Sequence, residues 1–112
     1  MSNPSKRKGT AWESRVVLFL RAVGWPTAER RAPSGAADQG DVAGVLGVCI
    51  EAKAVARWSP SKWLRELEVE MTNSGCEVGA VWAKVAGKAG AEQGVILMSP
   101  AVFTRLLKEA GY

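Results

Sequence analysis

The sequence predicts a single-domain α/β (α+β) protein in which helices flank one mixed β-sheet, in the order α-β-β-β-α-β-β-α. Two observations predict this class. The chain has 112 residues, of which 47% are hydrophobic and 23% are charged, close to the averages of one globular domain. Helical and strand periodicities also alternate along it, with turn residues between them. We expect a flexible basic tail at 1–8 and one domain at 9–112.

The first helix is expected to begin at Thr10 and to end at Gly24. Thr10 precedes Glu13 by three residues, which is the spacing of a capping box, and glycine is typical of helix ends. One apolar stripe follows from a period of 3.6 residues. Its members are Trp12, Val16, Phe19, Leu20 and Val23.

Turn residues separate the remaining elements. We expect strands at 27–32, 41–46, 48–53, 77–85 and 94–98. The last two are nearly continuous apolar runs and are therefore expected to be buried. Two Ser-Pro pairs, Ser59-Pro60 and Ser99-Pro100, predict helices that end near Gly75 and Gly111. Their inward residues are expected to be Trp63, Leu64, Leu67 and Met71, then Val102, Phe103, Leu106 and Leu107.

The composition excludes several kinds of chemistry. The chain has no histidine, which excludes a Ser-His-Asp triad and histidine zinc sites. Two cysteines, Cys49 and Cys76, are expected to be free thiols in a reducing, cytoplasmic compartment. No apolar run reaches the ~18 residues that span a bilayer, so we expect no membrane partner.

Positive charge gathers in the first quarter of the chain. Residues 1–31 hold seven basic and two acidic residues, a net of +5, whereas the remainder holds eight basic and nine acidic residues. A basic segment on so small a domain indicates a polyanionic partner. For Lys6, Arg7 and Lys8 alone, a solvated tail that aids solubility is an equally good interpretation.

Two charged residues share one face of the strand expected at 48–53. Glu51 and Lys53 are two residues apart, while Val48, Ile50 and Ala52 point to the other face, toward the core. A central strand rarely carries two charges on one face unless they meet each other, a ligand or a metal.

A second carboxylate is expected beside Glu51. Asp41 begins the preceding strand, and the short connection makes the two strands antiparallel neighbours. Adjacent carboxylates repel and raise each other's pKa unless a cation lies between them, and such an oxygen site suits Mg²⁺, with Mn²⁺ as a substitute. Lys53 is then placed to orient a water or to stabilise negative charge. Glu13, at the edge of the first helix's apolar stripe, can lean toward the same site.

Each of these residues also has a purely structural interpretation. Glu13 is explained by the capping box, and Glu51 with Lys53 by an ion pair on a solvated face. Asp41 can cap the turn after Gly40. The joint order of a helix Glu, a strand Asp and a Glu-x-Lys favours the metal site.

Asp41, followed after nine residues by Glu51-Ala52-Lys53, resembles the motif of the PD-(D/E)XK nucleases, whose restriction-endonuclease-like core has the same element order. Segments 9–13 (GTAWE), 30–35 (RRAPSG) and 40–43 (GDVA) resemble the archaeal-type Holliday junction resolvases. Segments 38–41 (DQGD) and 81–84 (VWAK) are similar to small phage resolvases. One residue departs from the family pattern: Gly40 stands where the family has proline.

The resemblance implies an Mg²⁺-dependent endonuclease that cuts four-way DNA junctions in recombination and repair, in a bacterial or phage-infected cell, without a small-molecule cofactor. Asp41, Glu51 and the Ala52 carbonyl would hold the metal, Lys53 would position the attacking water, and Glu13 would complete the acidic site. Ser34 matches a serine near the scissile phosphate, although a turn residue in Pro-Ser-Gly explains it as well. Asp38 is an extra acid in the same loop.

DNA contacts are expected from basic residues before and after the acidic motif. They are Lys6, Arg7, Lys8, Arg15, Arg30, Arg31 and Lys84. Such residues hold the phosphate backbone without reading sequence. Because a four-way junction requires two symmetrical cuts, we expect a homodimer on branched double-stranded DNA. The alternatives are a related nuclease that acts on flaps, nicks or duplex DNA, and a non-catalytic DNA-binding module.

Overall fold

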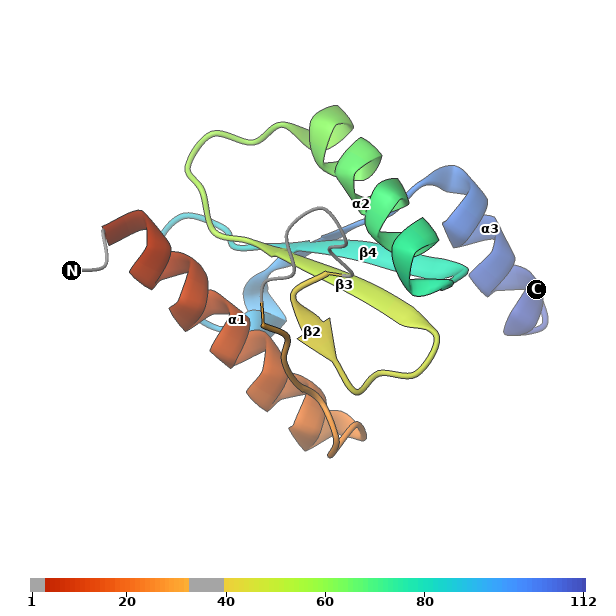
Figure 1. Cartoon of the computed structure of the whole chain (residues 1–112), viewed down its shortest axis with the longest axis horizontal. Coiled ribbons are helices and arrows are strands. Elements are labelled where there is room, and N and C mark those ends of the chain that lie inside the picture. The colour runs from red at the N-terminus through yellow and green to blue at the C-terminus, as the bar shows by residue number, and fades with distance from the viewer. Residues whose placement is uncertain (1–3, 33–39) are drawn as a thin grey trace.

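The computed structural model describes residues 4–32 and 40–112, with side chains from Arg7 onward. Within these two ranges, three helices and five strands form one domain, in the order that the sequence predicts, with a short 3₁₀ helix added before the last strand (Figure 1). The elements are α1 (Pro4–Val23), β1 (Glu29–Arg30), β2 (Val42–Ala43), β3 (Val48–Lys53), α2 (Pro60–Ser74), β4 (Val78–Ala83), η2 (Ala91–Gln93), β5 (Val95–Leu97) and α3 (Pro100–Glu109). The predicted fold class is confirmed.

The five strands form one mixed sheet in the order β1-β2-β3-β4-β5. Neighbouring strands are antiparallel except β3 and β4, which are parallel because the chain crosses through α2 between them. Val42 of β2 pairs with Ile50, and Glu51 pairs with Val81 of β4. Strands β1 and β2 are shorter than predicted. Gly44, with φ of +84°, ends β2 where a side chain would collide with the backbone of Thr27.

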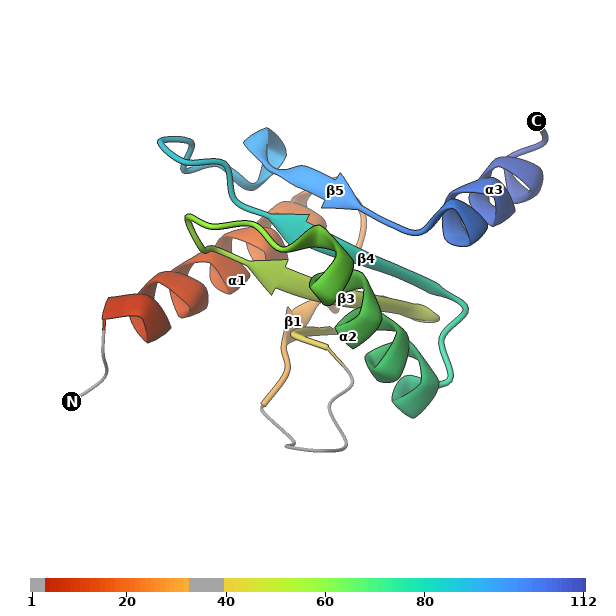
Figure 2. The same ribbon diagram turned by 90° about the horizontal axis from the view of Figure 1, so that it is seen from above.

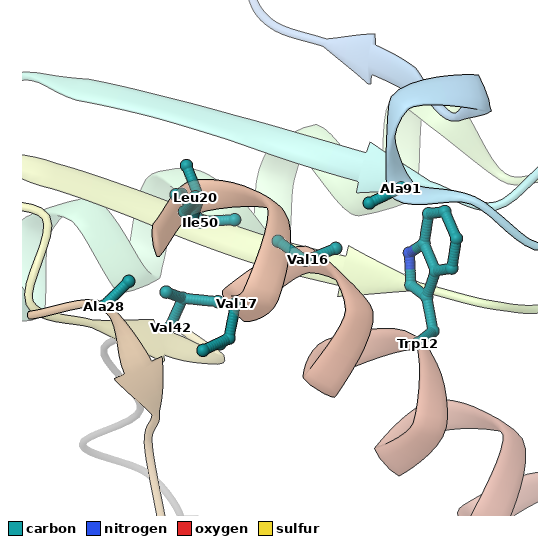
Figure 3. Packing of buried hydrophobic residues seen from close by; sticks show 8 residues of the cluster. All are labelled: Trp12, Val16, Val17, Leu20, Ala28, Val42, Ile50 and Ala91. Atoms are coloured by element: carbon teal, nitrogen blue, oxygen red, sulfur yellow. The ribbon is translucent and has the colours of Figure 1, made fainter. Parts of the chain in front are cut away.

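Helices cover both faces of the sheet (Figure 2). α1 packs on one face against β1 and β3, and α2 packs on the other against β3 and β4. The hydrophobic core beneath α1 is drawn in Figure 3 and consists of Trp12, Val16, Val17, Leu20, Ala28, Val42, Ile50 and Ala91. A second cluster beneath α2 contains Cys49, Trp63, Leu67, Val81 and Ala83. The charged face of β3 is therefore the face that α2 covers.

The expected start of the first helix at Thr10 is wrong, because α1 begins at Pro4. Lysine and arginine are good helix formers, so the basic segment continues the helix backward instead of preceding it as a separate tail. The carbonyl of Thr10 lies inside the helix and accepts a hydrogen bond from the Ser14 hydroxyl at 3.0 Å. The predicted end is confirmed, since Gly24 follows the helix with φ of +132°.

The apolar stripe of α1 lies slightly rotated from the predicted one. Trp12, Val16 and Leu20 are buried as expected, whereas Val23 is 52% exposed and Val17 is buried in its place. Val23 is the last residue of α1, directly before Gly24, where the helix ends.

The predicted burial of the last strand is wrong, and the predicted inward face of the last helix is confirmed for Val102, with Leu106 and Leu107 half-buried, but not for Phe103. Val95 and Ile96 of β5 are 37% and 44% exposed, because β5 is the edge of the sheet. Figure 2 shows α3 leading away from the sheet beyond β5. Val102 is the buried residue of α3, whereas Phe103 is 52% exposed.

Neither cysteine forms a disulfide, as predicted. Cys49 is buried beneath α2 and Cys76 is half-buried after it. Within residues 4–32 and 40–112, no helix combines the length and the apolar character that crossing a membrane requires.

Two tryptophans connect α1, β4 and η2 through their indole groups. Trp12 is 1% exposed, and its Nε1 donates to the Trp82 carbonyl at 3.0 Å. Trp82 Nε1 donates in turn to the Ala91 carbonyl at 2.9 Å. The Trp12→Phe variant loses the first bond and part of the buried volume, so we expect urea titration to show a free energy of unfolding lower by about 2 kcal/mol.

Trp25→Phe is the matched control, because Trp25 is 45% exposed. Its free energy of unfolding should stay within about 0.5 kcal/mol of the wild type. An equal decrease of the free energy of unfolding in both variants would contradict the role of the Trp12 hydrogen bond.

Candidate active site

Gly40 brings Asp41 against the middle of β3. The Asp41 amide donates to the Ile50 carbonyl at 2.8 Å, next to the β2–β3 ladder. Gly40 has φ of +98°, and a Cβ there would lie 3.0 Å from both Cys49 Sγ and the Ile50 carbonyl oxygen. Proline holds φ near −65°, so this backbone conformation excludes it. Glycine at position 40 therefore agrees with the local geometry, and Asp41 still reaches the strand.

Asp41 and Glu51 lie side by side, as the antiparallel register predicts. Val42 faces the α1 core, so Asp41, its neighbour in the chain, projects to the opposite face, which it shares with Glu51. A hydrogen bond joins their two carboxyl groups, and Asp41 Oδ2 accepts from the Ala52 amide at 2.7 Å. Glu51 is only 7% exposed. The two carboxyl groups are thus adjacent and partly buried beside β3.

This crowding raises the pKa of Asp41 to about 8. Burial, which disfavours the charged carboxylate, is the largest cause, and the negative charge of Glu51 is the second. The Ala52 amide opposes the shift, whereas the charge of Glu13 and the hydrogen bond with Glu51 add to it. Near neutral pH the pair therefore retains a proton, which a bound cation would displace.

Lys53 lies on the same side of the sheet as Glu51, as predicted. Its Nζ is 3.7 Å from Glu51 Oε1 and 3.7 Å from Glu66 Oε2 on α2. The ammonium also lies 5.9 Å from the centre of the Trp63 ring. The Lys53 and Glu51 side chains are only 20% and 10% exposed. The structural interpretation of these residues is therefore confirmed in part: Glu51 and Lys53 form an ion pair, but α2 covers the face that was expected to be solvated.

Glu13 binds Arg30, which joins α1 to β1. Arg30 Nε and Nη2 each lie 3.1 Å from Glu13 Oε2. The capping-box interpretation of Glu13 is wrong, because α1 begins nine residues earlier. Its charge still raises the pKa of Asp41, so Glu13 belongs to the electrostatic surroundings of the site.

The donor chemistry at Asp41 and Glu51 fits a hard divalent cation. Both side chains offer only oxygen, the ligand atom that Mg²⁺ and Mn²⁺ prefer. In the part of the chain that the structure describes, no three His, Cys, Asp or Glu side chains are grouped so as to hold a metal ion. Two carboxylates with a main-chain carbonyl, such as that of Ala52, match the usual Mg²⁺ arrangement of few protein ligands and several waters.

The remaining predicted residues are Arg7 and three groups. The loop residues Ser34 and Asp38, and the side chain of Lys6, lie outside the described part of the chain. Arg30 and Arg31 flank the acidic site, and the Arg31 amide donates to the Asp41 carbonyl at 2.8 Å. The third group surrounds a cavity at the end of the sheet and contains Lys8, Arg15 and Lys84. Arg7 is exposed on α1.

Sequence reasoning did not single out Glu66, and it treated Trp63 only as a core residue. Both contact the Lys53 ammonium from α2. The available signal was their spacing, since residues three apart share one face of a helix. A charged residue on the face that carries Trp63 indicates a polar partner on β3.

The scan against protein-family models, the search of curated proteins and the search of solved structures found no match to this chain.

Proposed function

We propose that this protein is a divalent-metal-dependent, structure-selective DNA endonuclease of the PD-(D/E)XK type, with a four-way junction as its substrate. One observation carries the proposal: Asp41 and Glu51 are hydrogen-bonded neighbours, and Lys53 Nζ lies 3.7 Å from Glu51. Two carboxylates and an amine on one face of the sheet are a set that this chemistry can use.

Hydrolysis of a phosphodiester requires an in-line water and compensation of the charge that grows on the phosphate. Mg²⁺ supplies both when bound, because it lowers the pKa of a bound water and neutralises phosphate oxygens. Asp41 and Glu51 are the residues that would hold it. Lys53 is placed to orient the water or to stabilise the developing negative charge. Glu66 and Trp63 restrict the Lys53 ammonium to this position.

Basic side chains support a nucleic acid as the substrate. Arg7, Lys8 and Arg15 are exposed along α1, and Lys84 follows β4. Contacts of this kind bind phosphates whatever the sequence, so junction affinity should fall steeply with salt.

A homodimer with two-fold symmetry is part of the proposal. Each chain contributes one Asp41–Glu51 site, and resolving a junction requires one cut in each of two symmetry-related strands. A two-fold axis presents two equivalent sites in the required orientation.

The test is a cleavage assay on a synthetic four-way junction, a flap and a linear duplex of matched length, with Mg²⁺, Mn²⁺ or EDTA. We expect paired cuts in the junction with either metal and none in EDTA, together with the mass of a dimer in solution. Equal rates on all three DNAs would contradict junction selectivity. Tight binding without metal-dependent cleavage would contradict the nuclease and leave a DNA-binding module.

A further inference from the structure

A cavity of about 420 Å³ lies at the end of the sheet where β3 and β4 finish. The first half of α1 forms one wall, and the segments after β3 and β4 form the others. Figures 1 and 2 both show these two segments at the same end of the molecule as the first turns of α1. Neither Asp41 nor Glu51 lines this cavity.

The charged side chains that line the cavity are all positive. Lys8, Arg15 and Lys84 contribute three cations, and the described residues around the cavity include no acid. Lys8 and Arg15 are seven residues apart and so share one face of α1. The Lys84 amide donates to the Lys53 carbonyl at 2.8 Å, which fixes the base of the Lys84 side chain beside the end of β3. Such a lining attracts a phosphate.

The rest of the lining is apolar and includes one aromatic ring. Small side chains of segment 54–56 leave room, and Trp58 contributes an indole that is 36% exposed. That indole packs against Trp63, with ring centres 5.9 Å apart and planes tilted by 50°. Trp58 is therefore held in place on one side while it lines the cavity on another.

We propose that this cavity binds one unpaired nucleotide of a DNA strand, with the base against Trp58 and the phosphate among Lys8, Arg15 and Lys84. The volume falls in the range of about 300–1,000 Å³ that is typical of sites for small ligands. Stacking on an aromatic ring together with basic groups is how proteins hold unpaired nucleotides. A base inside a duplex cannot enter, because its faces are covered by its stacked neighbours.

The identification of the strand as DNA depends on the proposed function. The contacts also connect the cavity to the acidic site. Segment 54–56 directly follows Lys53, and Trp58 packs on Trp63, whose ring lies 5.9 Å from the Lys53 ammonium. A nucleotide that leaves its stack near a branch point would therefore occupy this cavity while the adjoining strand passes the carboxylates.

Binding is tested on the full chain in EDTA, so that no cleavage occurs. The probes are a fluorescent single-stranded oligo-dT of four nucleotides, a blunt duplex and free dTMP. We expect the oligonucleotide to bind, and Trp58→Ala to weaken its affinity by about tenfold or more, as the loss of one stacked base predicts. We expect Arg15→Gln to weaken it also and to lower the slope of log affinity against log salt by about one.

Trp25→Ala and Lys108→Gln are matched controls, because both residues are exposed and lie outside the cavity. Their affinities should equal that of the wild type, and circular dichroism should show that all four variants are folded. Affinities within twofold of the wild type for both Trp58→Ala and Arg15→Gln would overturn the proposal. Tighter binding of dTMP than of the oligonucleotide would assign the cavity to a free nucleotide and would overturn the DNA strand as its ligand.

The binding test of the cavity and the cleavage test of the proposed nuclease can fail independently of each other. Failure of junction cleavage in Mg²⁺ together with Trp58-dependent oligonucleotide binding refutes the nuclease and retains the cavity. Metal-dependent cleavage together with unchanged oligonucleotide binding by Trp58→Ala and Arg15→Gln refutes the cavity as a nucleotide site and retains the nuclease.

Discussion

Asp41→Asn and Glu51→Gln are each expected to lower the rate of junction cleavage by about 10³-fold or more, while the protein still folds and binds the junction. Each substitution removes one of the two carboxylates that share the site beside β3. The several kcal/mol of charge stabilisation that a bound divalent ion supplies are then lost. Single-turnover cleavage in Mg²⁺ measures the rate, and a gel-shift titration in EDTA measures binding.

Glu68→Gln is the matched control, because Glu68 is an exposed acid on α2. Its cleavage rate should equal that of the wild type. Lys53→Ala should also abolish cleavage while junction binding is largely retained, since its ammonium lies 3.7 Å from Glu51. Wild-type rates in Asp41→Asn and Glu51→Gln would refute the proposed active site.

The pairing of Asp41 with Glu51 was predictable because it depends on local rules. Alternation along a strand places Glu51 and Lys53 on one face, and the short connection between 43 and 48 makes the two strands antiparallel. These rules involve few residues and leave few possible arrangements of the two strands. Helix α2 was predictable for the same reason, since Ser59-Pro60 and Gly75 mark its ends.

Other features depend on tertiary contacts that local patterns do not contain. The exposure of Val95 and Ile96 follows from β5 being at the edge of the sheet, which an apolar run does not reveal. The ion pair between Glu13 and Arg30 requires α1 to lie against β1, seventeen residues away along the chain. Both features are decided by how complete elements pack together.

The raised pKa of Asp41 makes the stability of the metal-free protein depend on pH. In the unfolded chain this carboxyl has its ordinary pKa of 3.8, whereas in the folded protein the pKa is about 8. Between these values the folded state binds more protons than the unfolded state. The stabilisation from this proton is complete below pH 3.8 and is lost as the pH rises through about 8. The free energy of unfolding of the wild type, relative to Asp41→Asn, should therefore fall across this window.

A bound metal ion should restore the stability that is lost at high pH, because Mg²⁺ binds the deprotonated carboxylates. We expect about 10 mM Mg²⁺ to raise the wild-type Tm by about 5 °C near pH 8.5, equivalent to roughly 1 kcal/mol. Near pH 5.5 the rise should be much smaller, because Asp41 then holds its proton in competition with the ion. Asp41→Asn should show little rise at either pH, and thermal scans with Mg²⁺ or EDTA measure both proteins. The same rise in Asp41→Asn as in the wild type would place the ion elsewhere on the protein, and a rise that does not depend on pH would contradict the shared proton.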